Sequence, residues 1–234
     1  MIGPYRRRPP ASSTDPNTLL LISGRGANGS APIDSSQYSN VIGVGGNATI
    51  TTSVADPFGA SQGVIGFDGT GDSILFPNVS AFNSNTTHSL EFFYRRVSGN
   101  AMLYQRAGSV GSWNGTNGVE MLIYISGNTF DMPFNNGTSA PTSITINSGA
   151  AFAANTWIHC LESYNGATTR LFINGSLVGS SSASRVTPSS VSAPRMGDYS
   201  LAPGLSMNGQ LAQVRWRNVA VIANFTPPPA PFTP

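Results

Sequence analysis

The sequence predicts an all-β fold. Three observations carry this prediction: short apolar runs with strand-like alternation, clusters of Gly, Asn, Asp and Ser between these runs, and no helical pattern of ordinary length. The clearest cluster, residues 68–72 (DGTGD), separates the apolar runs 64–67 and 73–76. Asp-Gly and Gly-Asp favour the positive φ angles of tight turns, so this stretch predicts a β-hairpin. Because the pattern recurs down the chain, it favours a sandwich or a jelly roll.

The clearest strand patterns lie in residues 90–95, 119–125, 157–161, 170–178 and 212–217. In the first two segments, the expected core residues are Leu90, Phe92, Tyr94, Val119, Met121, Ile123 and Ile125. Asn174-Gly175 in the fourth segment predicts a tight hairpin turn. In the last segment, Ala212, Val214 and Trp216 are expected to face the core, and Gln213, Arg215 and Arg217 to face water.

The chain divides into a short arm and one domain. A length of 234 residues suits a single large β-domain. Residues 1–17, rich in Pro, Ser and Arg, are predicted to form a flexible arm that anchors the protein to a partner. Residues 18–234 are predicted to form the domain, whose Pro-rich end from residue 226 onward should lie extended across the surface.

Charge is concentrated in the arm. All 12 basic residues are Arg, and Arg6, Arg7 and Arg8 lie together there. From Thr18 onward nine arginines balance nine acidic residues, so the net charge of +2 belongs to the arm. Domains that bind nucleic acid carry a basic face or stripe, so nucleic acid is not an expected partner. No apolar run approaches the roughly 18 residues of a membrane span, so a membrane segment is not expected either.

The carboxylates do not follow the pattern of a glycosidase. Such an enzyme needs two carboxyl groups on either side of the scissile bond, roughly 5–9 Å apart. Glu91, Glu120 and Glu162 each stand alone in their strand segments. The sequence therefore predicts a protein that is not an enzyme.

The histidines and the cysteine favour structural roles. His159 alternates with Trp157 and Leu161, so we interpret it as a hydrogen-bonded residue of the inner face. His88 begins a strand segment and is expected to be solvated. The single cysteine, Cys160, excludes an internal disulfide and is interpreted as a small apolar strand residue. No cluster of His and Cys suggests zinc.

Three aspartates in turns are the candidate ligands of a calcium ion: Asp34, Asp68 and Asp72. Calcium requires several oxygen ligands, which these carboxylates and nearby backbone carbonyls would supply. The favoured interpretation is that each side chain instead caps its own turn. The predicted fold therefore needs no cofactor, and calcium is the alternative.

An ordered set of short motifs resembles the concanavalin A-like lectin/glucanase superfamily, in particular the laminin G-like jelly-roll domains of bacteriophage virion proteins. The motifs are residues 19–21 (LLL), 34–36 (DSS), 47–48 (NA), 58–59 (FG), 67–72 (FDGTGD), 89–92 (SLEF), 157–159 (WIH), 171–175 (LFING), 196–197 (MG), 208–209 (NG) and 223–228 (ANFTPP). The resemblance implies a jelly-roll sandwich of two antiparallel sheets, with glycan binding in some members and structural roles in others. Phage relatives usually carry Asp-Glu in the final strand where this chain has Ala212-Gln213, so the resemblance does not support a calcium site there.

The resemblance implies a function in a phage particle. The expected protein is a virion decoration module that the arm residues Arg6, Arg7 and Arg8 attach to capsid or tail proteins, and it is expected to be a homo-oligomer. The alternative is an adhesin that binds host-surface polysaccharide through loops in which aromatic rings stack on sugars and amides bond hydroxyls. Its candidate residues are Trp113, Asn114, Asn117, Asn135, Asn136, Asp198 and Tyr199. For Trp113, a plug at the end of the sandwich or a subunit contact is an equally open interpretation. A glycoside hydrolase is the third alternative.

Overall fold

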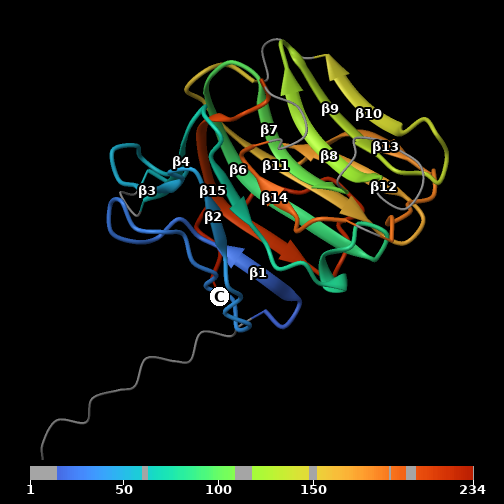
Figure 1. The fold of residues 1–234 in the computed structure, drawn as a ribbon, viewed down its shortest axis with the longest axis horizontal. Helices are drawn as coiled ribbons and strands as arrows, with labels where there is room; N and C mark the ends of the chain where they lie inside the picture. The colour runs from blue at the N-terminus through green and yellow to red at the C-terminus, as the bar shows by residue number, and fades with distance from the viewer. Residues whose placement is uncertain are drawn as a thin grey trace, which may run out of the picture.

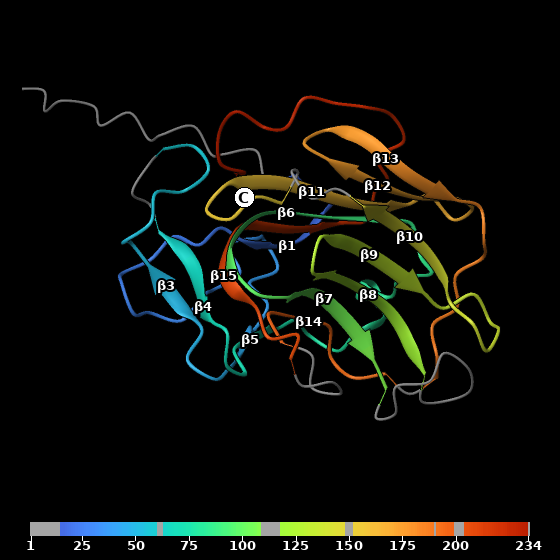
Figure 2. The ribbon, with the colours of Figure 1, turned by 90° about the horizontal axis from the view of Figure 1, so that it is seen from above.

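The structure is a computed structural model, and it describes residues 15–59, 63–108, 118–147, 152–189, 191–198 and 204–233. Two antiparallel sheets face each other, as Figure 2 shows from above. The eight-stranded sheet contains, in order, β13 (Ser176–Ser181), β12 (Thr169–Ile173), β11 (Trp157–Tyr164), β6 (His88–Ser98), β15 (Asn208–Arg217), β4 (Val64–Asp68) and β3 (Thr49–Thr51), with β1 (Thr18–Ile22) also paired to β15. The seven-stranded sheet contains β10 (Thr142–Asn147), β9 (Thr129–Phe134), β8 (Val119–Ser126), β7 (Ala101–Ala107), β14 (Arg195–Met196), β5 (Ser73–Leu75) and β2 (Gly43–Gly45) (Figure 1).

The predicted fold class is confirmed. The one helical element in the described ranges is the 3-10 turn Ser80–Phe82, and none of their elements is a helix that could span a membrane. The main core lies between the sheets, where the β6 residues Leu90, Phe92 and Tyr94 are buried as expected. From the neighbouring β11, Ile158 and Cys160 enter the same core. Burial raises the pKa of the Cys160 thiol, in keeping with its interpretation as an apolar strand residue.

The turn at residues 68–72 joins the two sheets, so the predicted hairpin is wrong. β4, before the turn, belongs to the eight-stranded sheet, and β5, after it, belongs to the seven-stranded sheet. The turn residues themselves behave as expected, because Gly69 and Gly71 have φ angles of 93° and 68°. The Asp72 carboxylate accepts the backbone N–H groups of Asn47 (2.7 Å) and Asp68 (2.8 Å). Turn chemistry alone does not tell a hairpin from a corner between sheets, and here the strands pair with distant partners.

A bulge in β15 changes which side chains face the core. The register shifts between Ala212 and Arg215, where Gln213 has a φ of 54°. As a result, the β15 residues in the main core are Leu211, Val214 and Trp216. Ala212 and Gln213 lie on the outer face, where the Gln213 side chain donates to the Ser23 carbonyl and accepts from the Phe232 backbone, both at 2.9 Å. The expectations for Ala212 and Gln213 are therefore wrong, because the bulge interrupts the alternation.

A second irregularity affects Val119 at the start of β8. The pairing of β7 with β8 shifts between Arg106 and Ala107. Met121, Ile123 and Ile125 enter the main core as expected, but Val119 packs with Met102 and Leu122 in a separate cluster on the other face.

The end of the chain, residues 218–233, forms a C-terminal strap over the outer face of the eight-stranded sheet. The Phe225 N–H donates to the Gly175 carbonyl (3.0 Å), and its ring contacts that of Phe172. Phe232 packs with a second cluster of buried residues: Leu21, Val64, Phe93 and Ala212. No residue from 218 to 233 belongs to a strand, as the prediction of an extended Pro-rich end requires. The strap buries apolar side chains on the outer face, which that prediction did not include.

Candidate functional site

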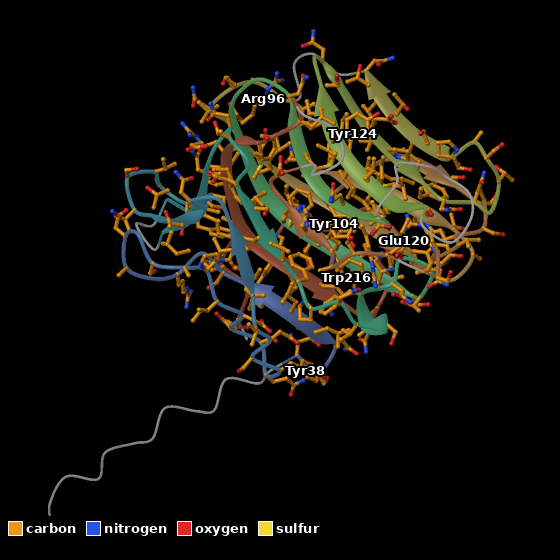
Figure 3. All side chains as sticks on the ribbon, in the orientation of Figure 1. Tyr38, Arg96, Tyr104, Glu120, Tyr124 and Trp216 are labelled. Atoms are coloured by element: carbon orange, nitrogen blue, oxygen red, sulfur yellow. The ribbon has the colours of Figure 1, made fainter. Side chains whose placement is uncertain are left out.

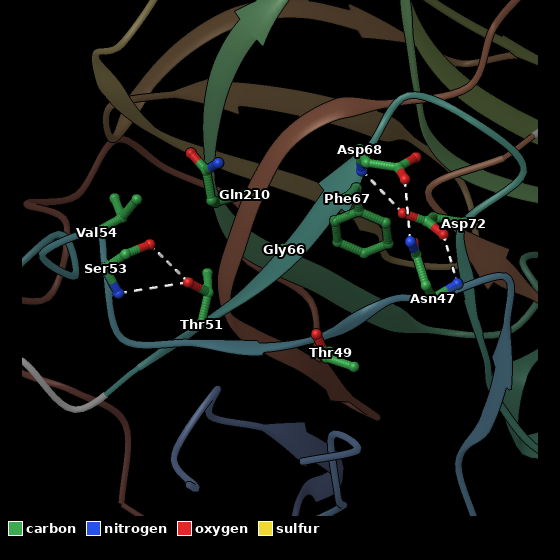
Figure 4. Close-up of a pocket in the computed structure, with 10 residues that line it drawn as sticks. All are labelled: Asn47, Thr49, Thr51, Ser53, Val54, Gly66, Phe67, Asp68, Asp72 and Gln210. Atoms are coloured by element: carbon green, nitrogen blue, oxygen red, sulfur yellow. Dashed lines mark hydrogen bonds between the residues drawn. The ribbon is translucent and has the colours of Figure 1, made fainter. Parts of the chain in front are cut away.

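Two open grooves at the corner between the sheets form the candidate binding site. The first, the β3 groove, has a volume of about 300 Å³, and its polar lining includes Asn47, Thr49, Thr51, Ser53, Asp68 and Gln210 (Figure 4). The second, the Asn208 groove, has a volume of about 290 Å³, and its lining includes Asp68, Ser98, Asn100, Ser206 and Asn208. The two grooves are neighbours, because Asp68 lines both of them.

The β3 groove exists because a glycine lies between two polar strands. On β3, Thr49 and Thr51 flank the buried Ile50 and therefore share the outer face. Thr49 pairs with Gly66 of β4, and Gly66 pairs on its other side with Gln210 of β15. Since Gly66 has no side chain, the sheet is hollow between Thr49 and Gln210. A Cβ at this position would lie 3.2 Å from Thr51 Cγ2.

The hydrogen-bonding groups of the site are mostly uncharged. Gln210 Oε1 accepts from Arg95 Nη1 (2.6 Å), while its amide nitrogen has no partner in the part of the chain that the structure describes. Asn208 Nδ2 donates to Ser98 Oγ (3.1 Å). No arginine lines either groove, and Phe67, the aromatic residue of the β3 groove, is only 4% exposed. The site can therefore offer donors and acceptors to a hydroxyl-rich ligand, but it lacks a stacking platform among its described lining residues.

The three candidate calcium ligands do not meet at one place. Asp68 and Asp72 lie at the corner, whereas Asp34 lies beside β1, where its carboxylate accepts the Leu21 N–H (2.9 Å). The Asp68 carboxylate accepts the Thr70 N–H (2.8 Å) and a bond from the Asn47 side chain. All three side chains bind donors of the chain itself, as turn capping predicts. Across the described ranges, no group of three or more His, Cys, Asp or Glu residues could hold a metal ion.

The candidate glycan residues in the described ranges lie at two separate places. Asn135 is 3% exposed, and its Nδ2 donates to the Val119 carbonyl at the start of β8 (3.0 Å). Asn136 follows it and donates to Thr142 Oγ1 (3.0 Å). Asp198 lies beyond the opposite end of the β7–β8 pair and accepts from Ser206 Oγ (2.7 Å). Asp198 thus contacts the Asn208 groove, whereas Asn135 and Asn136 hold their own turn.

The remaining predicted site residues fall outside the described ranges: Arg6, Arg7, Arg8, Trp113, Asn114, Asn117 and Tyr199. Three residues of the predicted arm, 15–17, do belong to the fold. Asp15 Oδ2 accepts from Arg217 Nε (3.0 Å), and the Asn17 carbonyl accepts the Asn218 N–H (3.0 Å).

His88 is buried, so the expectation that it is solvated is wrong. Its ring stacks on Trp216 with centroids 4.5 Å apart. Nε2 lies 2.7 Å from Glu162 Oε2, and Nδ1 lies 2.7 Å from the Thr86 carbonyl. Both ring nitrogens therefore lie within hydrogen-bond distance of an oxygen atom. Arg185 Nη2 contacts the other oxygen of Glu162 at 2.7 Å, so one buried carboxylate contacts both the His88 ring and the Arg185 guanidinium.

His159 is a hydrogen-bonded buried residue, as expected, but on the opposite face of its sheet. Ile158 and Cys160, not His159, point between the sheets. His159 lies under the C-terminal strap, where its Nε2 is 3.2 Å from Glu91 Oε2 and its ring contacts that of Phe225. Burial alone raises the pKa of Glu91, but the His159 hydrogen bond and the Arg215 charge outweigh it and lower that pKa. The cluster lies beneath the strap, and none of its residues lines either groove.

Comparison with known families identifies the fold family. The sequence profile of the concanavalin A-like lectin/glucanases superfamily matches residues 68–224, more than half of the chain. The chain belongs to this superfamily. The resemblance seen in its short motifs is thereby confirmed at the level of the superfamily. A search of curated protein sequences found no match.

Solved structures with a similar fold include binding domains of botulinum neurotoxins. The serotype D binding domain has a TM-score of 0.64 and 13% identity, over 88% of this chain and 49% of that chain. The binding domain of neurotoxin DC in complex with rat synaptotagmin II has a TM-score of 0.62 and 15% identity, over 88% of this chain and 49% of that chain. This chain thus spans about half the length of these toxin chains. At such identities the similarity is one of fold.

Sequence reasoning singled out Asp68 and Asp72 but missed the strand residues of the groove lining. Thr49, Gly66 and Gln210 come together only through the pairing of β3, β4 and β15. The alternation Thr49-Ile50-Thr51 was the one local signal, because it predicts a short strand with a polar outer face.

Proposed function

We propose that this protein is a non-catalytic accessory module displayed on the surface of a bacteriophage particle and attached to the capsid or tail through its N-terminal end. The observation that carries the proposal is that the start of the described chain and the grooves lie at opposite ends of β15. The described chain begins beside Arg217, at one end of this strand, whereas the grooves lie beside Asn208, at the other end. Nine residue steps of about 3.3 Å separate these ends by about 30 Å. Attachment at the N-terminal end therefore leaves the grooves facing away from the particle.

The chain's closing segment supports a phage origin. Residues 223–228 resemble the closing phrase of phage virion members of the superfamily, and here they are built into the fold. Asn224 Oδ1 accepts the Leu177 N–H (2.8 Å), and the Phe225 N–H donates to Gly175. The segment that carries the resemblance is therefore also a hydrogen-bonded part of this fold.

The burial and the bonding partners of the carboxylates support a role without catalysis. All 10 acidic residues lie in the described ranges. Glu91, Glu120 and Glu162 are buried in ion pairs with arginine or histidine, away from the grooves. Asp68 and Asp72 do reach a groove, but the Asp72 oxygens accept two backbone N–H groups, which is the geometry of a turn cap and not of a general acid. Structures with this fold that are described as a binding domain and as a receptor binding domain also favour binding over catalysis.

Deletion of residues 1–14 is expected to remove the protein from the particle. The deletion stops before Asp15, so the ion pair with Arg217 and the fold remain. It removes Arg6, Arg7 and Arg8, whose charge-assisted contacts are expected to account for a loss of about tenfold or more in copies per particle. Quantitative mass spectrometry of purified particles measures this number, and thermal unfolding verifies that the shortened protein is folded. Absence of the full-length protein from purified particles would overturn the proposal.

Binding of a bacterial surface polysaccharide in the grooves is the second candidate function. It is favoured by the uncharged donors and acceptors around Asp68, and many copies on one particle would strengthen weak binding. Replacement of Asp68 by Ala is expected to weaken binding about tenfold, because the carboxylate is shared by both grooves. The matched control is Thr70→Ala, in the same turn but outside both linings. An array of bacterial polysaccharides provides the measurement, and equal binding by Asp68→Ala and wild type would contradict this candidate alone.

A further inference from the structure

Two neighbouring rows of paired residues lie under the two grooves. In the first row, Gly66 of β4 pairs with Gln210 of β15, and both residues line the β3 groove (Figure 4). In the second row, Asp68 of β4 pairs with Asn208 of β15, and both line the Asn208 groove. On each strand the two residues are two positions apart, so the rows lie on the same face of the sheet, about 7 Å from each other. The corner therefore repeats one arrangement at a fixed spacing.

Each row presents an amide side chain whose orientation is set by a neighbour. Arg95 Nη1 donates to Gln210 Oε1 (2.6 Å), so the amide nitrogen of Gln210 is left as a donor for a ligand. In the second row, Asn208 Nδ2 donates to Ser98 Oγ (3.1 Å), so the amide oxygen of Asn208 is left as an acceptor. A hydroxyl group both donates and accepts, and a sugar unit can therefore bind to either row.

The Asp68 carboxylate lies at the junction of the two grooves, because it lines both. One of its oxygens accepts the Thr70 N–H (2.8 Å) and the other accepts from the Asn47 side chain (3.1 Å). Each carboxylate oxygen has two lone pairs, so both oxygens can accept a further hydrogen bond from a ligand. An acidic group of the ligand at this point would meet a like charge. The junction thus favours hydroxyl donors over acidic groups.

Two arginines close to the rows are engaged by other groups and line neither groove. Arg95 already donates to Gln210. Arg96, at the next position of β6, donates to the Gly127 carbonyl (3.2 Å) in the turn between β8 and β9 of the other sheet. Figure 3 shows Arg96 well apart from the buried Glu120, so that carboxylate and its ion pair are distant from the rows. Among the charged residues of the described linings there are only carboxylates, and the corner therefore favours a neutral ligand.

Each groove has the size for one small unit of a ligand. Their volumes, about 300 and about 290 Å³, are at the lower end of the roughly 300–1,000 Å³ of sites for drug-sized ligands. Because the grooves share Asp68 and repeat the same arrangement, a polymer with a repeating unit can place adjacent units in both of them.

We propose that the two grooves are adjacent subsites for one neutral, linear polysaccharide, with one sugar unit over the row of Gly66 and Gln210, the next unit over the row of Asp68 and Asn208, and the Asp68 carboxylate at their junction. The inference rests on the proposed function in its second form, polysaccharide binding, and it names the class of polysaccharide and the part of it that is bound. A single sugar unit fills only one subsite and therefore binds weakly.

Fragments of increasing length test whether two adjacent units are bound. The probe is the neutral polysaccharide that binds most strongly on the array, cut by partial acid hydrolysis into fragments from a single unit upward. We expect the affinity to rise about 10–100-fold from one unit to two, because the second unit adds two or three hydrogen bonds. Each further unit should add less than about threefold, since it lies beyond both grooves. Isothermal titration calorimetry of the full-length protein measures these affinities.

Two variants examine the grooves separately. Gln210→Ala changes the first row and Asn208→Ala the second, and each is expected to weaken binding of the two-unit fragment about tenfold. The matched control is Asn147→Ala, which removes an amide that also bonds a hydroxyl (Thr129 Oγ1, 3.2 Å) but lies in the other sheet, outside both linings. The control should bind like wild type, and thermal unfolding verifies that all three variants are folded.

The outcomes separate this inference from the function on which it rests. If no polysaccharide on the array binds, polysaccharide binding fails and the inference fails with it. If only acidic polysaccharides bind, the function stands and the inference is wrong. The same conclusion follows if a single unit binds as strongly as two, or if only one of Gln210→Ala and Asn208→Ala weakens binding, because the ligand would then occupy one groove.

Discussion

Replacement of Glu162 by Gln is expected to lower the free energy of unfolding by about 3–5 kcal/mol, a fall in Tm of about 6–20 °C for a domain of this size. The Glu162 carboxylate lies between the sheets and contacts the His88 ring and the Arg185 guanidinium at 2.7 Å each. Gln fills the same volume but carries no charge. The variant therefore leaves the buried Arg185 guanidinium without its anion, although Arg185 keeps its contacts with Thr169, Ser84 and Met121 and with the Phe134 and Tyr164 rings.

The pH dependence of this loss identifies its cause. Burial alone raises the pKa of Glu162, but the Arg185 charge and His88 outweigh it and hold that pKa below its ordinary value of 4.5. A carboxyl group with a lower pKa in the folded chain stabilises the fold above the pKa of the unfolded chain, and this contribution disappears as pH falls through the folded pKa. The gap between wild type and Glu162→Gln is therefore expected to be complete at neutral pH and to narrow below pH 4.5. Urea unfolding at a series of pH values measures it.

Two further variants separate charge from volume. Asp131→Asn is the matched control, because Asp131 is half-buried and bonds only neutral partners, among them the Tyr124 hydroxyl (2.7 Å); its loss should stay below about 1 kcal/mol. Adding Arg185→Met to Glu162→Gln should cost less than the sum of the two single changes, since it removes the buried cation that Glu162→Gln leaves unpaired. An equal loss at neutral and acidic pH would contradict the electrostatic explanation.

The features that the sequence predicted are local ones. Asn174-Gly175 forms the expected turn between β12 and β13, with φ angles of 50° and 80°, because two adjacent residues determine that conformation. The faces of β6 were predictable for the same reason, since period-two alternation is a property of a few consecutive residues. Superfamily membership was visible because many such local motifs occur in a fixed order.

The features that the sequence did not predict depend on distant partners. His88 looked solvated because it begins a strand, and only the pairing of β6 with β11 brings Glu162 to it. Gln213 was predicted to face water because no local pattern marks the bulge in β15. In the fold, its side chain is buried and accepts the N–H of the strap residue Phe232. The β3 groove is a further case, because its hollow floor is a glycine whose neighbours Thr49 and Gln210 come from opposite ends of the chain. Polar sites formed across strands are therefore hard to locate without the register.

Replacement of Phe232 by Ala is expected to cost about 3–5 kcal/mol and to release the end of the C-terminal strap. Phe232 is 5% exposed and packs on Phe93, and the Arg215 guanidinium lies 3.8 Å from its ring centre. Its backbone N–H also satisfies the buried Gln213 side chain. Loss of the ring removes apolar burial and a cation–π contact together, and it admits water to the ion pair between Arg215 and Glu91.

Limited trypsin digestion distinguishes release of the strap from a general loss of stability. Cleavage after Arg217 separates the strap from the domain, so Phe232→Ala is expected to be cut there faster than wild type under conditions in which both are folded. Thr233→Ala is the matched control, because Thr233 is exposed at the next position and should change stability by no more than about 0.5 kcal/mol. Wild-type stability and protease resistance in Phe232→Ala would mean that the other contacts of the strap, those of Asn218, Val221, Asn224 and Phe225, are sufficient to hold it. The ring of Phe232 would then add little to the stability of the outer cluster that it packs against. The contacts of Glu91 with His159 and Arg215 would likewise be stable without that ring above them.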